Sequence, residues 1–591
     1  MIPRSTLSSR QSVFRQSILV GMIAITLSRS FAAEPQAVPI SSSDQLYAPE
    51  NLIKVEITVA PKDWDKLRFS WRGEAMEEKD GKWVATKSDY EYVSGEVTIN
   101  SVKVGKVGLR KKGYFGSLSA QRPSLKLKFD EYVKGQQFVG LDELTLNNNR
   151  QDASLLRQYL AYMWFRRAGL HASRCNFARV FVNGKYLGIY SNVEAVDKAF
   201  LKRNFDSTKG ALFEGTDQDF QPQAVEAIEA KTDKKSPDRS KLRELARLLQ
   251  NFESVDMEKL GELVDLDRFM KFWVAEMLLG HWDGYAGGKN NFFVYDSPKS
   301  KRIDFLPWGT DQTFDDSSPF ISEPSPRITR GVGRLCAALY SNPTYRQRYL
   351  SLVAKQLDEW WKTTALLAEL DRATALIRPH IHLRQSEFDQ ALTGLREYIE
   401  SIPRKVREEL KNPPDRWVVK VPQEGPELPP STGPQAPRWA GSVKSDFTIP
   451  FGRYDVAKLH SLTNGTFEFE WRGKPIDFPI MVGTAGYKAT DPFWFESSEV
   501  AIARTSPTTG QTVWIYFDID PGLLTSGHEL KLHKSQVVSW FGTLQAGKEG
   551  PINHGTVEGT LKVGLVEVGG VKQIKGTIDA HLVSDRQKLE F

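Results

Sequence analysis

Alternation of apolar and polar residues predicts several strands in the first part of the chain. Residues 52–58 read Leu-Ile-Lys-Val-Glu-Ile-Thr, and a period of two residues is typical of a half-buried strand. The clearest local signal is Asn183-Gly184 between two alternating runs, which predicts a type I′ hairpin. Further strands are expected at 92–99, 102–109, 124–129, 291–295 and 303–307.

Helical periodicity follows and then dominates. Asp152 can cap a helix that runs to residue 167 and is stopped by Gly169. Asp197 can open a short basic helix through residue 205, and an apolar helix over 266–279 is expected to end at Gly280. A charged helical stretch is expected at 221–265, and helices prevail from residue 333 to about 411. Strands and helices together predict an α+β fold.

The composition changes near residue 412. Eight prolines fall between Pro413 and Pro437, and this density predicts a stiff linker over 412–440. Beyond it, short strands recur between Gly and Asn turns, which predicts a separate β-sandwich-like domain at 441–591. The main domain is expected at 52–411. Residues 34–51 are polar and are expected to be loose.

The amino terminus has the layout of a secretory signal peptide, predicted at residues 1–33. Arg4, Arg10 and Arg15 precede an apolar run at 17–27, and small residues follow up to Ala33. The run is short for a membrane span, and an uncleaved anchor is the alternative. No later stretch approaches 18 apolar residues. The mature protein is therefore expected to be secreted, periplasmic or at the cell surface, with no integral membrane segment.

Overall composition and charge exclude several classes of protein. The 591 residues include 79 Lys and Arg and 73 Asp and Glu. Removing the predicted leader, which holds four arginines and no acidic residue, leaves 75 basic and 73 acidic residues and a net charge of +2. Such a balance favours no nucleic-acid partner. Two cysteines, Cys175 and Cys336, exclude a disulfide scaffold or a Cys-rich zinc module, and a single bridge between them stays open.

The residues with potential chemistry are carboxylates and amides in apolar surroundings. The sequence has no Walker A, GxGxxG, HExxH, GxSxG or CxxC motif. Asp283 follows the apolar helix, Asn290 and Asn291 precede a strand, and Asp311 follows the next strand. Carboxylate and amide oxygens suit Mg²⁺. The alternative is structural, with Asp283 capping a loop and the two asparagines serving a turn.

A basic cluster precedes these residues. Arg110 and Lys112 share one face of a predicted strand, and Lys126 and Lys128 share one face of the next. Two basic strand faces joined by residues 113–117 could cradle phosphates. The alternative is a pair of solvated strand faces.

In this order the motifs resemble the spore coat protein H (CotH) kinase family, from about residue 52 to about residue 411. The stretch 110–113, Arg-Lys-Lys-Gly, is similar to the family's arginine-rich motif, and residues 124–129 to its lysine strand. Residues 153–169 look like its central helix. The hairpin at 179–190, followed by Glu194 and by Phe-Leu-Lys-Arg at 200–203, resembles its most recognisable stretch. Asp283, the strand starting at Asn291, and Asp311 match its closing motifs. The collinear order of the motifs carries the resemblance.

This resemblance implies an atypical protein-kinase-like fold that transfers the γ-phosphate of ATP to Ser or Thr of secreted or cell-surface proteins, with Mg²⁺ or Mn²⁺. General kinase mechanics then assign a role to each matching position. The implied roles are Asp283 as base, Asn291 and Asp311 as metal ligands, Lys126 (or Lys128 in its place) with Arg110 at the phosphates, and Glu194 as the partner of the lysine.

One departure from the family pattern bears on activity. The family usually carries two acids in Trp-Asp-x-Asp, whereas residues 308–311 read Trp-Gly-Thr-Asp. Losing a metal ligand reduces the neutralisation of phosphate charge. If Asp311 carries the metal, activity survives; if both acids are required, the protein is a pseudokinase. Asp315 and Asp316 stand nearby as substitutes.

Two non-catalytic functions stay open. The protein could be a surface binding or adhesion protein, or a structural protein of the envelope. The C-terminal segment contains several tryptophans. Tryptophan side chains can stack on sugars in glycan-binding modules, and packing in the domain core is the alternative role for them. These residues are Trp471, Trp494, Trp514 and Trp540.

Overall fold

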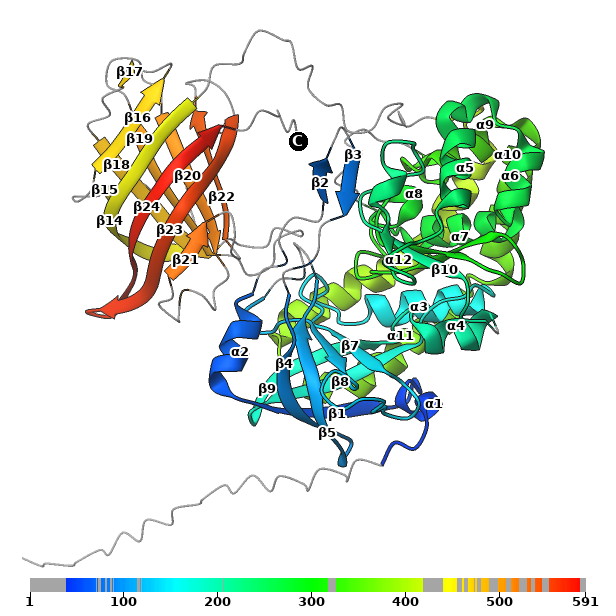
Figure 1. Ribbon diagram of the computed structural model, residues 1–591, viewed down its shortest axis with the longest axis horizontal. Helices are drawn as coiled ribbons and strands as arrows, with labels where there is room; N and C mark the ends of the chain where they lie inside the picture. The colour runs from blue at the N-terminus through cyan, green and yellow to red at the C-terminus, as the bar shows by residue number, and fades with distance from the viewer. Residues whose placement is uncertain are drawn as a thin grey trace, which may run out of the picture.

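The computed structural model describes most of residues 39–584, and Figure 1 shows the arrangement of its elements. The ranges outside the description are 1–38, 71, 73–75, 80–81, 86–87, 89, 114–116, 118, 206, 317–325, 418–438, 454–459, 462–465, 472–473, 476–479, 488–497, 506–511, 520–523, 525–528, 533–536, 545–551 and 585–591. The predicted signal peptide and most of the predicted linker therefore lie outside the described residues.

A closed barrel forms the first part of the molecule, with strand order β1-β4-β5-β6-β7-β9-β8 (Figure 1). Only β1 and β8 run parallel among these neighbours, and this pair closes the ring. Asn183 and Gly184 have φ values of 49° and 78°, as a type I′ turn requires, so the predicted hairpin is confirmed. The strands are β1 Leu52–Val59, β4 Val93–Ile99, β5 Val102–Lys111, β6 Leu125–Lys128, β7 Glu143–Asn147, β8 Cys175–Val182 and β9 Lys185–Val193. A separate hairpin joins β2 Met76–Lys79 and β3 Lys82–Ala85.

Residues 39–51 are packed on this barrel, which differs from the predicted loose segment. Helix α1, Ser43–Leu46, begins at a Ser42 cap, and Leu46 and Tyr47 are buried in the barrel core. Asn176 on β8 donates its amide to the carbonyl oxygens of Leu46 and Ala48. The polar composition of the segment gave no indication of these buried contacts. Helix α2, Pro61–Arg68, follows β1.

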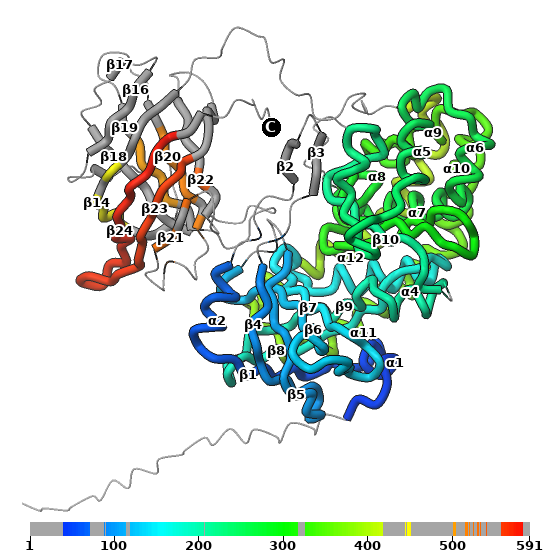
Figure 2. The backbone as a smooth tube through the Cα atoms, viewed as in Figure 1, coloured from blue at the N-terminus to red at the C-terminus, as the bar shows by residue number. Residues whose placement is uncertain are grey.

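The second part, which we call the helical body, comprises α3 and residues 198–417. Its core combines aromatic and aliphatic side chains from α3, α7, α9, α10, α11 and α12 with those of a small sheet of order β11-β10-β12-β13. Figure 2 shows its helices following the barrel strands along the chain. The strands are β10 Ala211–Gly215, β11 Glu229–Ala230, β12 Phe292–Asp296 and β13 Ile303–Pro307. The helices are α3 Arg157–Arg167, α4 Lys198–Phe205, α5 Ser240–Leu248, α6 Met257–Leu263, α7 Leu266–Leu279, α8 Tyr285–Gly288, α9 Arg334–Ser341, α10 Pro343–Glu359, α11 Thr363–Ile377 and α12 Gln385–Lys411, with 3-10 turns at Val225–Ala227, Leu249–Ser254, Arg327–Thr329 and Arg378–His380.

Two helix predictions meet different outcomes. Asp197 accepts hydrogen bonds from the backbone N–H groups of Ala199 and Phe200 and caps α4 as expected. The helix predicted from Asp152 begins only at Arg157, because Leu155 adopts a left-handed φ of 60°. The Asp152 carboxylate instead accepts from the N–H groups of Ser154 and Arg157 and closes a turn before the helix.

The described residues of the C-terminal part form mainly β-strands, as predicted, but these strands belong to one sheet rather than to the two sheets of a sandwich. Strand β14 pairs with both β24 and β18, so the path β18-β19-β20-β22-β23-β24-β14 returns on itself. Its core is formed by residues of these strands together with Ala120 of the barrel region. The strands are β14 Trp439–Arg453, β15 His460–Ser461, β16 Thr466–Trp471, β17 Lys474–Pro475, β18 Ile480–Tyr487, β19 Ser498–Thr505, β20 Thr512–Ile519, β21 Glu529–Leu532, β22 Val537–Leu544, β23 Ile552–Val568 and β24 Val571–Ser584.

Two further expectations concern the cysteines and the membrane. Cys175 on β8 and Cys336 on α9 are both buried and free, so they form no bridge with each other. In the part of the chain that the structure describes, no helix combines the length and the apolar character needed to cross a membrane.

Candidate active site between the barrel and the helical body

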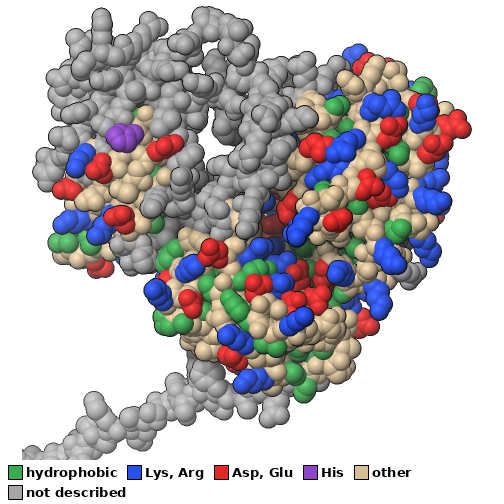
Figure 3. Space-filling view, in the orientation of Figure 1, with side chains coloured by type: hydrophobic (Ala, Val, Ile, Leu, Met, Phe, Trp, Pro, Cys, Tyr) green, Lys and Arg blue, Asp and Glu red, His purple; other side chains and the backbone are tan. Residues whose placement is uncertain are grey.

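A large cleft of about 2110 Å³ separates the barrel from the helical body. Lys and Arg side chains and Asp and Glu side chains surround the hollow between these two parts (Figure 3). The barrel wall comes from the outer face of β5, β6 and β7, and the opposite wall comes from β10, β12, β13 and the loops at their ends. The cleft brings together Asp283, Asn291, Asp311, Arg110, Lys126 and Lys128, all of which were singled out from the sequence.

The loop that carries Asp283 is held by the end of α7. Gly280 closes α7 in a left-handed conformation with φ of 61°, which turns the chain back towards the helix. The Glu276 carboxylate on α7 then accepts hydrogen bonds from the backbone N–H groups of Tyr285 and Ala286, at 3.1 and 2.8 Å. These bonds fix the residues that follow Asp283 to a buried helix.

Asp283 itself is surrounded by amide donors. Its two carboxylate oxygens accept from the side-chain amides of Asn290 and Asn291, at 3.0 and 2.6 Å. Burial is the main cause that raises the pKa of Asp283 to about 7. The nearby Asp311 and Asp217 contribute to the rise, while the Asn290 hydrogen bond and His281 oppose it. A carboxyl group with this pKa can take up a proton near neutral pH.

Asp311 follows β13 and is the second carboxylate of the cleft. Burial raises its pKa, and the positive charge of Lys112 on the barrel wall opposes that rise. His281 connects the two aspartate loops, since its Nε2 lies 3.3 Å from the carbonyl oxygen of Gly309 and its Nδ1 lies 3.5 Å from Glu276 Oε1. Although burial lowers the pKa of His281, its contact with Glu276 leaves that pKa above the ordinary value.

The side chain of Asn291 lies directly beside Gly309, the position at which the family resemblance leads us to expect an acid. Gly309 has a left-handed φ of +51°, and a Cβ atom there would lie 2.3 Å from Asn291 Oδ1. Asn291 also has a positive φ of 46°, and its Nδ2 is bound to Asp283. A side chain at position 309 and the present Asn291 conformation are therefore mutually exclusive.

The basic wall carries four cations on neighbouring strands. Arg110 on β5 stands opposite Lys126 on β6 in the sheet register, and Lys112 directly follows β5. Lys126 Nζ lies 2.7 Å from Glu143 Oε2 on β7, and Lys128 Nζ lies 3.0 Å from Glu131 Oε2. The acid that pairs with Lys126 is thus Glu143, a strand residue that no sequence motif had marked.

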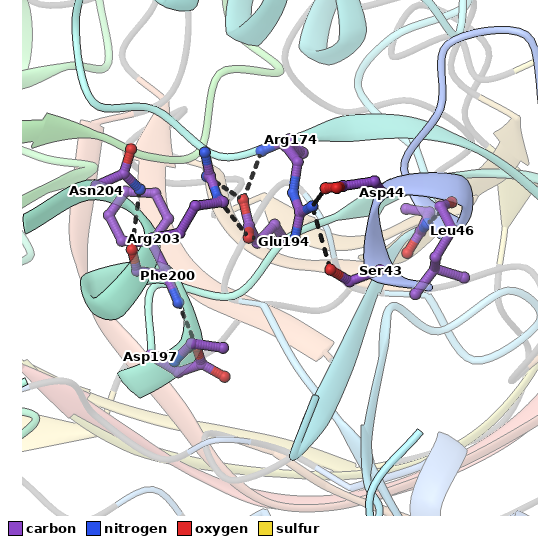
Figure 4. A network of polar contacts seen from close by, with 11 residues as sticks. Ser43, Asp44, Leu46, Arg174, Glu194, Asp197, Phe200, Arg203 and Asn204 are labelled. Carbon is purple, nitrogen blue, oxygen red and sulfur yellow. Dashed lines mark hydrogen bonds and ion pairs between the residues drawn. The ribbon is translucent and has the colours of Figure 1, made fainter. Parts of the chain in front are cut away.

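The expected pairing of Glu194 with a cleft lysine is wrong. Glu194 is buried away from the cleft, where its carboxylate contacts the guanidinium groups of Arg174, at 2.7 Å, and Arg203, at 2.5 Å (Figure 4). Arg174 also contacts Asp44 of α1, at 2.6 Å. Glu194 therefore joins β8, α4 and the N-terminal segment, and it serves the connection between barrel and body.

Lys112 is a cleft residue that the sequence-based site assignment left out. Its Nζ donates to Asn147 Oδ1 at 2.5 Å and lies 5.5 Å from the centre of the Trp308 ring. Burial lowers the pKa of Lys112 to about 8, although Asp311 and Glu214 act in the opposite direction. The alternation of strand faces placed Lys112 beside Arg110 in the predicted basic cluster, but the family motifs assigned the phosphate role to Lys126 and Arg110 instead.

The side-chain oxygens in the cleft are of the kind that binds hard cations such as Mg²⁺. Among the residues with described positions, no group of three or more His, Cys, Asp or Glu side chains is arranged to hold a metal ion. The cleft offers instead two partly buried aspartates, Asp283 and Asp311, with the side-chain oxygen of Asn291 nearby. Asp311 contributes to the raised pKa of Asp283, and a divalent cation relieves this kind of repulsion between carboxylates.

With this geometry in view, the comparison with known proteins is direct. Residues 109–417 match the family described as CotH kinase protein. The chain belongs to the CotH kinase family. The matched range begins on β5 with the basic wall and ends after α12, so it contains Arg110, Lys126, Asp283, Asn291 and Asp311.

Individual relatives are distant in sequence. The chain is 23% identical over 300 residues to the inner spore coat protein H of Bacillus subtilis, and the aligned region covers 47% of this chain and 81% of that protein. It is 23% identical over 265 residues to invasin CotH7 of Rhizopus delemar, covering 42% of this chain and 44% of that protein. It is also 24% identical to spore coat protein homolog 1 of the same fungus, with 37% of each chain covered. The match thus spans less than half the length of these fungal relatives.

Proposed function

We propose that this CotH family member is an atypical protein kinase that transfers the γ-phosphate of ATP to Ser or Thr hydroxyls of secreted or cell-surface proteins. One observation carries the proposal: two partly buried carboxylates, Asp283 and Asp311, face a wall of cations across one cleft. Phosphoryl transfer needs both a group that orients the acceptor hydroxyl and positive charge around the phosphates. The kinase-like fold that the family resemblance implies is part of this proposal.

Asp283 is the proposed base. Its pKa of about 7 suits the uptake of a proton from a hydroxyl group near neutral pH. Asn290 and Asn291 hold both of its oxygens and orient the carboxylate. The bonds from Glu276 to the backbone on one side keep this loop in place while the proton moves.

Mg²⁺ or Mn²⁺ is the proposed cofactor beside ATP. Asp311 and Asn291 would hold the cation, which supplies neutralisation of the charge on the phosphates when bound. Because Asn291 occupies the space beside Gly309, the amide oxygen stands where the family usually places a second acid. Lys126, held by Glu143, and Arg110 contribute positive charge on the opposite wall.

The substrates and location are proposed from the leader and from the relatives. The predicted signal peptide at residues 1–33 would export the chain. The names of the matched proteins refer to a spore coat and to invasins, which favours acceptors at a surface or outside the cell. After cleavage of the signal, no integral membrane segment is expected.

A transfer assay tests this function. The mature chain is incubated with ATP labelled at the γ-phosphate, Mg²⁺ or Mn²⁺, and a Ser-rich acceptor protein. Asp283→Asn is expected to lower the rate at least about 100-fold, whereas Asp371→Asn on α11, an exposed carboxylate paired with Arg396, serves as the control. Absence of transfer by the wild type, together with no ATP-dependent thermal shift, would contradict the proposal.

A non-catalytic surface-binding function is the second candidate, favoured by the names of the invasin relatives. The proposed glycan site would use C-terminal tryptophans. Trp514 is only 8% exposed and is packed with Ala501 and Ala503, so it is a core residue. Trp494 lies outside the described residues, and a glycan array with the C-terminal part and Trp471→Ala and Trp540→Ala variants tests the other two positions.

A further inference from the structure

Strand β5 and the residue directly after it present Arg110 and Lys112 to the cleft, while Lys111 between them points inward. Lys111 is fully buried, and its Nζ donates to the carbonyl oxygens of Arg68 and Ser70, at 2.8 and 3.1 Å. Alternation along the strand then directs both neighbours of Lys111 to the opposite face. Two cations therefore project from one strand into the same part of the cleft.

The four cations of the basic wall differ in how their charge is compensated. Lys126 is paired with Glu143, and Lys128 contacts Glu131 and Asp130. Within the described residues, neither Arg110 nor Lys112 has a carboxylate within ion-pair distance, and the Nε atom of Arg110 is buried with no hydrogen-bond acceptor. The uncompensated charges of this wall are thus on β5 and directly after it.

The surroundings of Lys112 hold its ammonium group in place without neutralising it. Its acceptor is the neutral side-chain oxygen of Asn147. Asn147 is itself fixed, since its Nδ2 donates to Gln158 Oε1 at 2.6 Å and Gln158 Nε2 donates to Asn149 Oδ1 at 3.0 Å. This chain of amides presents an oxygen to Lys112 and leaves two ammonium protons for other acceptors.

Burying a cation without an anionic partner is unfavourable, and an anionic ligand in the cleft reverses that cost. The charged groups that face Lys112 are Asp311 and Glu214, which favour its charged form, and Lys126 and Arg110, which oppose it. Burial outweighs the two carboxylates, so the pKa of Lys112 stays near 8. The cleft around Lys112 therefore gains electrostatically from an added negative charge.

We propose that Arg110 and Lys112 form the polyphosphate-binding site of the cleft, and that Lys126 is a positioning residue held by Glu143 rather than the principal phosphate ligand. This inference rests on the proposed function for the identity of the ligand as a nucleoside triphosphate. The site itself is defined by its chemistry, a pair of partly buried cations whose N–H groups can donate to a chain of phosphate groups. Trp308 beside Lys112 comes three residues before Asp311, so the polyphosphate would lie next to the proposed metal ligands.

Binding of inorganic tripolyphosphate and of ATP to the full mature chain, measured by calorimetry, tests the site. Lys112→Met is expected to weaken tripolyphosphate binding about tenfold or more, since a charge-assisted hydrogen bond is lost. Lys209→Met makes the same charge change at an exposed residue on the rim and is expected to alter affinity less than about threefold. Because Lys112→Met removes a partly buried charge that has no anionic partner, the variant is expected to unfold at the same temperature as wild type or higher.

A second readout separates a ligand contact from a structural role. The pKa of Lys112, followed by NMR on ¹³C-methylated lysines, is expected to rise when tripolyphosphate binds, because a bound anion favours the ammonium form. An unchanged Lys112 pKa on saturation would overturn the proposal. So would Lys126→Met abolishing tripolyphosphate binding while Lys112→Met retains wild-type affinity.

The outcomes for the site and for the kinase activity are distinguishable. Lys112-dependent tripolyphosphate binding without any phosphate transfer supports the site and contradicts the proposed function. Phosphate transfer with a Lys112→Met variant of unchanged ATP affinity supports the proposed function and overturns the site. A wild-type chain that binds neither ATP nor tripolyphosphate overturns both.

Discussion

Gly309 shows how one residue can determine the conformation of another across the cleft. Its φ of +51° lies in the left-handed region, and its Cα faces the Asn291 amide so closely that a Cβ would lie 2.3 Å from Oδ1. Asn291 in turn donates to Asp283. The glycine that replaces the usual family acid is therefore required by the present arrangement of Asn291 and Asp283.

We expect Gly309→Ala to destabilise the protein. The left-handed backbone alone costs a non-glycine residue about 1–2 kcal/mol, and displacement of Asn291 adds to this loss. Gly394→Ala on α12 is the matched control, since no atom lies within 4 Å of a Cβ there and alanine in a helix interior gains about 1 kcal/mol over glycine. Chemical denaturation measures both variants. A Gly309→Ala protein as stable as wild type would show that Asn291 has another favourable conformation.

The raised pKa of Asp283 predicts a pH-dependent stability. A carboxyl group with a folded pKa near 7 and an unfolded pKa near 4 binds more protons in the folded state between these values. Its contribution to stability is complete below the unfolded pKa and is lost as the pH rises through about 7. Without divalent cations, the melting temperature of Asp283→Asn relative to wild type is thus expected to increase from pH 5 to pH 8.

Asp371→Asn provides the comparison for this pH series. Asp371 is exposed on α11, so its variant is expected to differ from wild type by a constant amount over the same range. If the curves of Asp283→Asn and wild type ran parallel, the Asp283 carboxylate would be ionised at neutral pH in the folded protein.

At the scale of elements, the Glu194 network connects three segments that are distant in the sequence. Arg174 precedes β8, Arg203 lies on α4, and Asp44 lies on α1. Glu194 is 2% exposed and contacts both arginines (Figure 4). The chain passes from the barrel to the helical body immediately after Glu194, so this carboxylate fixes the exit of the chain from β9.

Glu194→Gln is expected to be strongly destabilising. Removing one partner of a buried ion pair leaves uncompensated charge and typically costs about 3–5 kcal/mol. Asp44→Asn acts on the same Arg174 from an exposed position and is expected to cost less than about 1 kcal/mol. Urea unfolding of both variants measures the difference, and a loss below 1 kcal/mol for Glu194→Gln would show that water enters and solvates the two arginines.

Local elements were predictable where a single segment contains the whole signal. The Asn183-Gly184 turn and the Asp197 cap depend on neighbouring residues and are found as expected. The partner of Glu194 was not predictable, because nothing in one sequence shows that Arg174 and Arg203 converge on it. Likewise, the cleft residues Asp283, Asn291 and Asp311 were identified from motif order. Lys112 was placed in the basic cluster by strand alternation, but its lack of an acidic partner, unlike Lys126 and Lys128, could be seen only in the structure.

At the scale of the whole molecule, hydrophobic cores divide the chain more clearly than composition does. The clusters of the barrel and of the helical body consist of residues between 40 and 417. The C-terminal cluster consists of residues from 447 onwards, joined by Ala120 and by the partly buried Phe69. The sequence predicted the second domain from its short strands. It could not predict one sheet rather than two, because ring closure by β14 depends on pairing between distant strands.

The boundary of the helical body lies later than the predicted start of the linker at residue 412. Trp417 packs against Trp273 and Tyr340, with ring centroids 5.7 and 5.8 Å away. The Tyr340 hydroxyl group also donates to the carbonyl oxygen of Pro414 at 2.7 Å. Residues 413–417 therefore complete the body, and the prolines that suggested a linker at this point belong in part to a packed segment.

This boundary predicts different stabilities for two truncated proteins that both begin at residue 39. The fragment 39–417 is expected to unfold cooperatively, because it retains all three clusters of the barrel and body. The fragment 39–411 lacks Trp417 and the acceptor of Tyr340, and loss of this partly buried aromatic side chain costs up to about 2 kcal/mol. Calorimetry of both fragments measures this difference, and Trp417→Ala in the longer fragment isolates the contribution of the ring. Equal melting temperatures for 39–411 and 39–417 would place the domain boundary at the end of α12 and contradict the role assigned to Trp417.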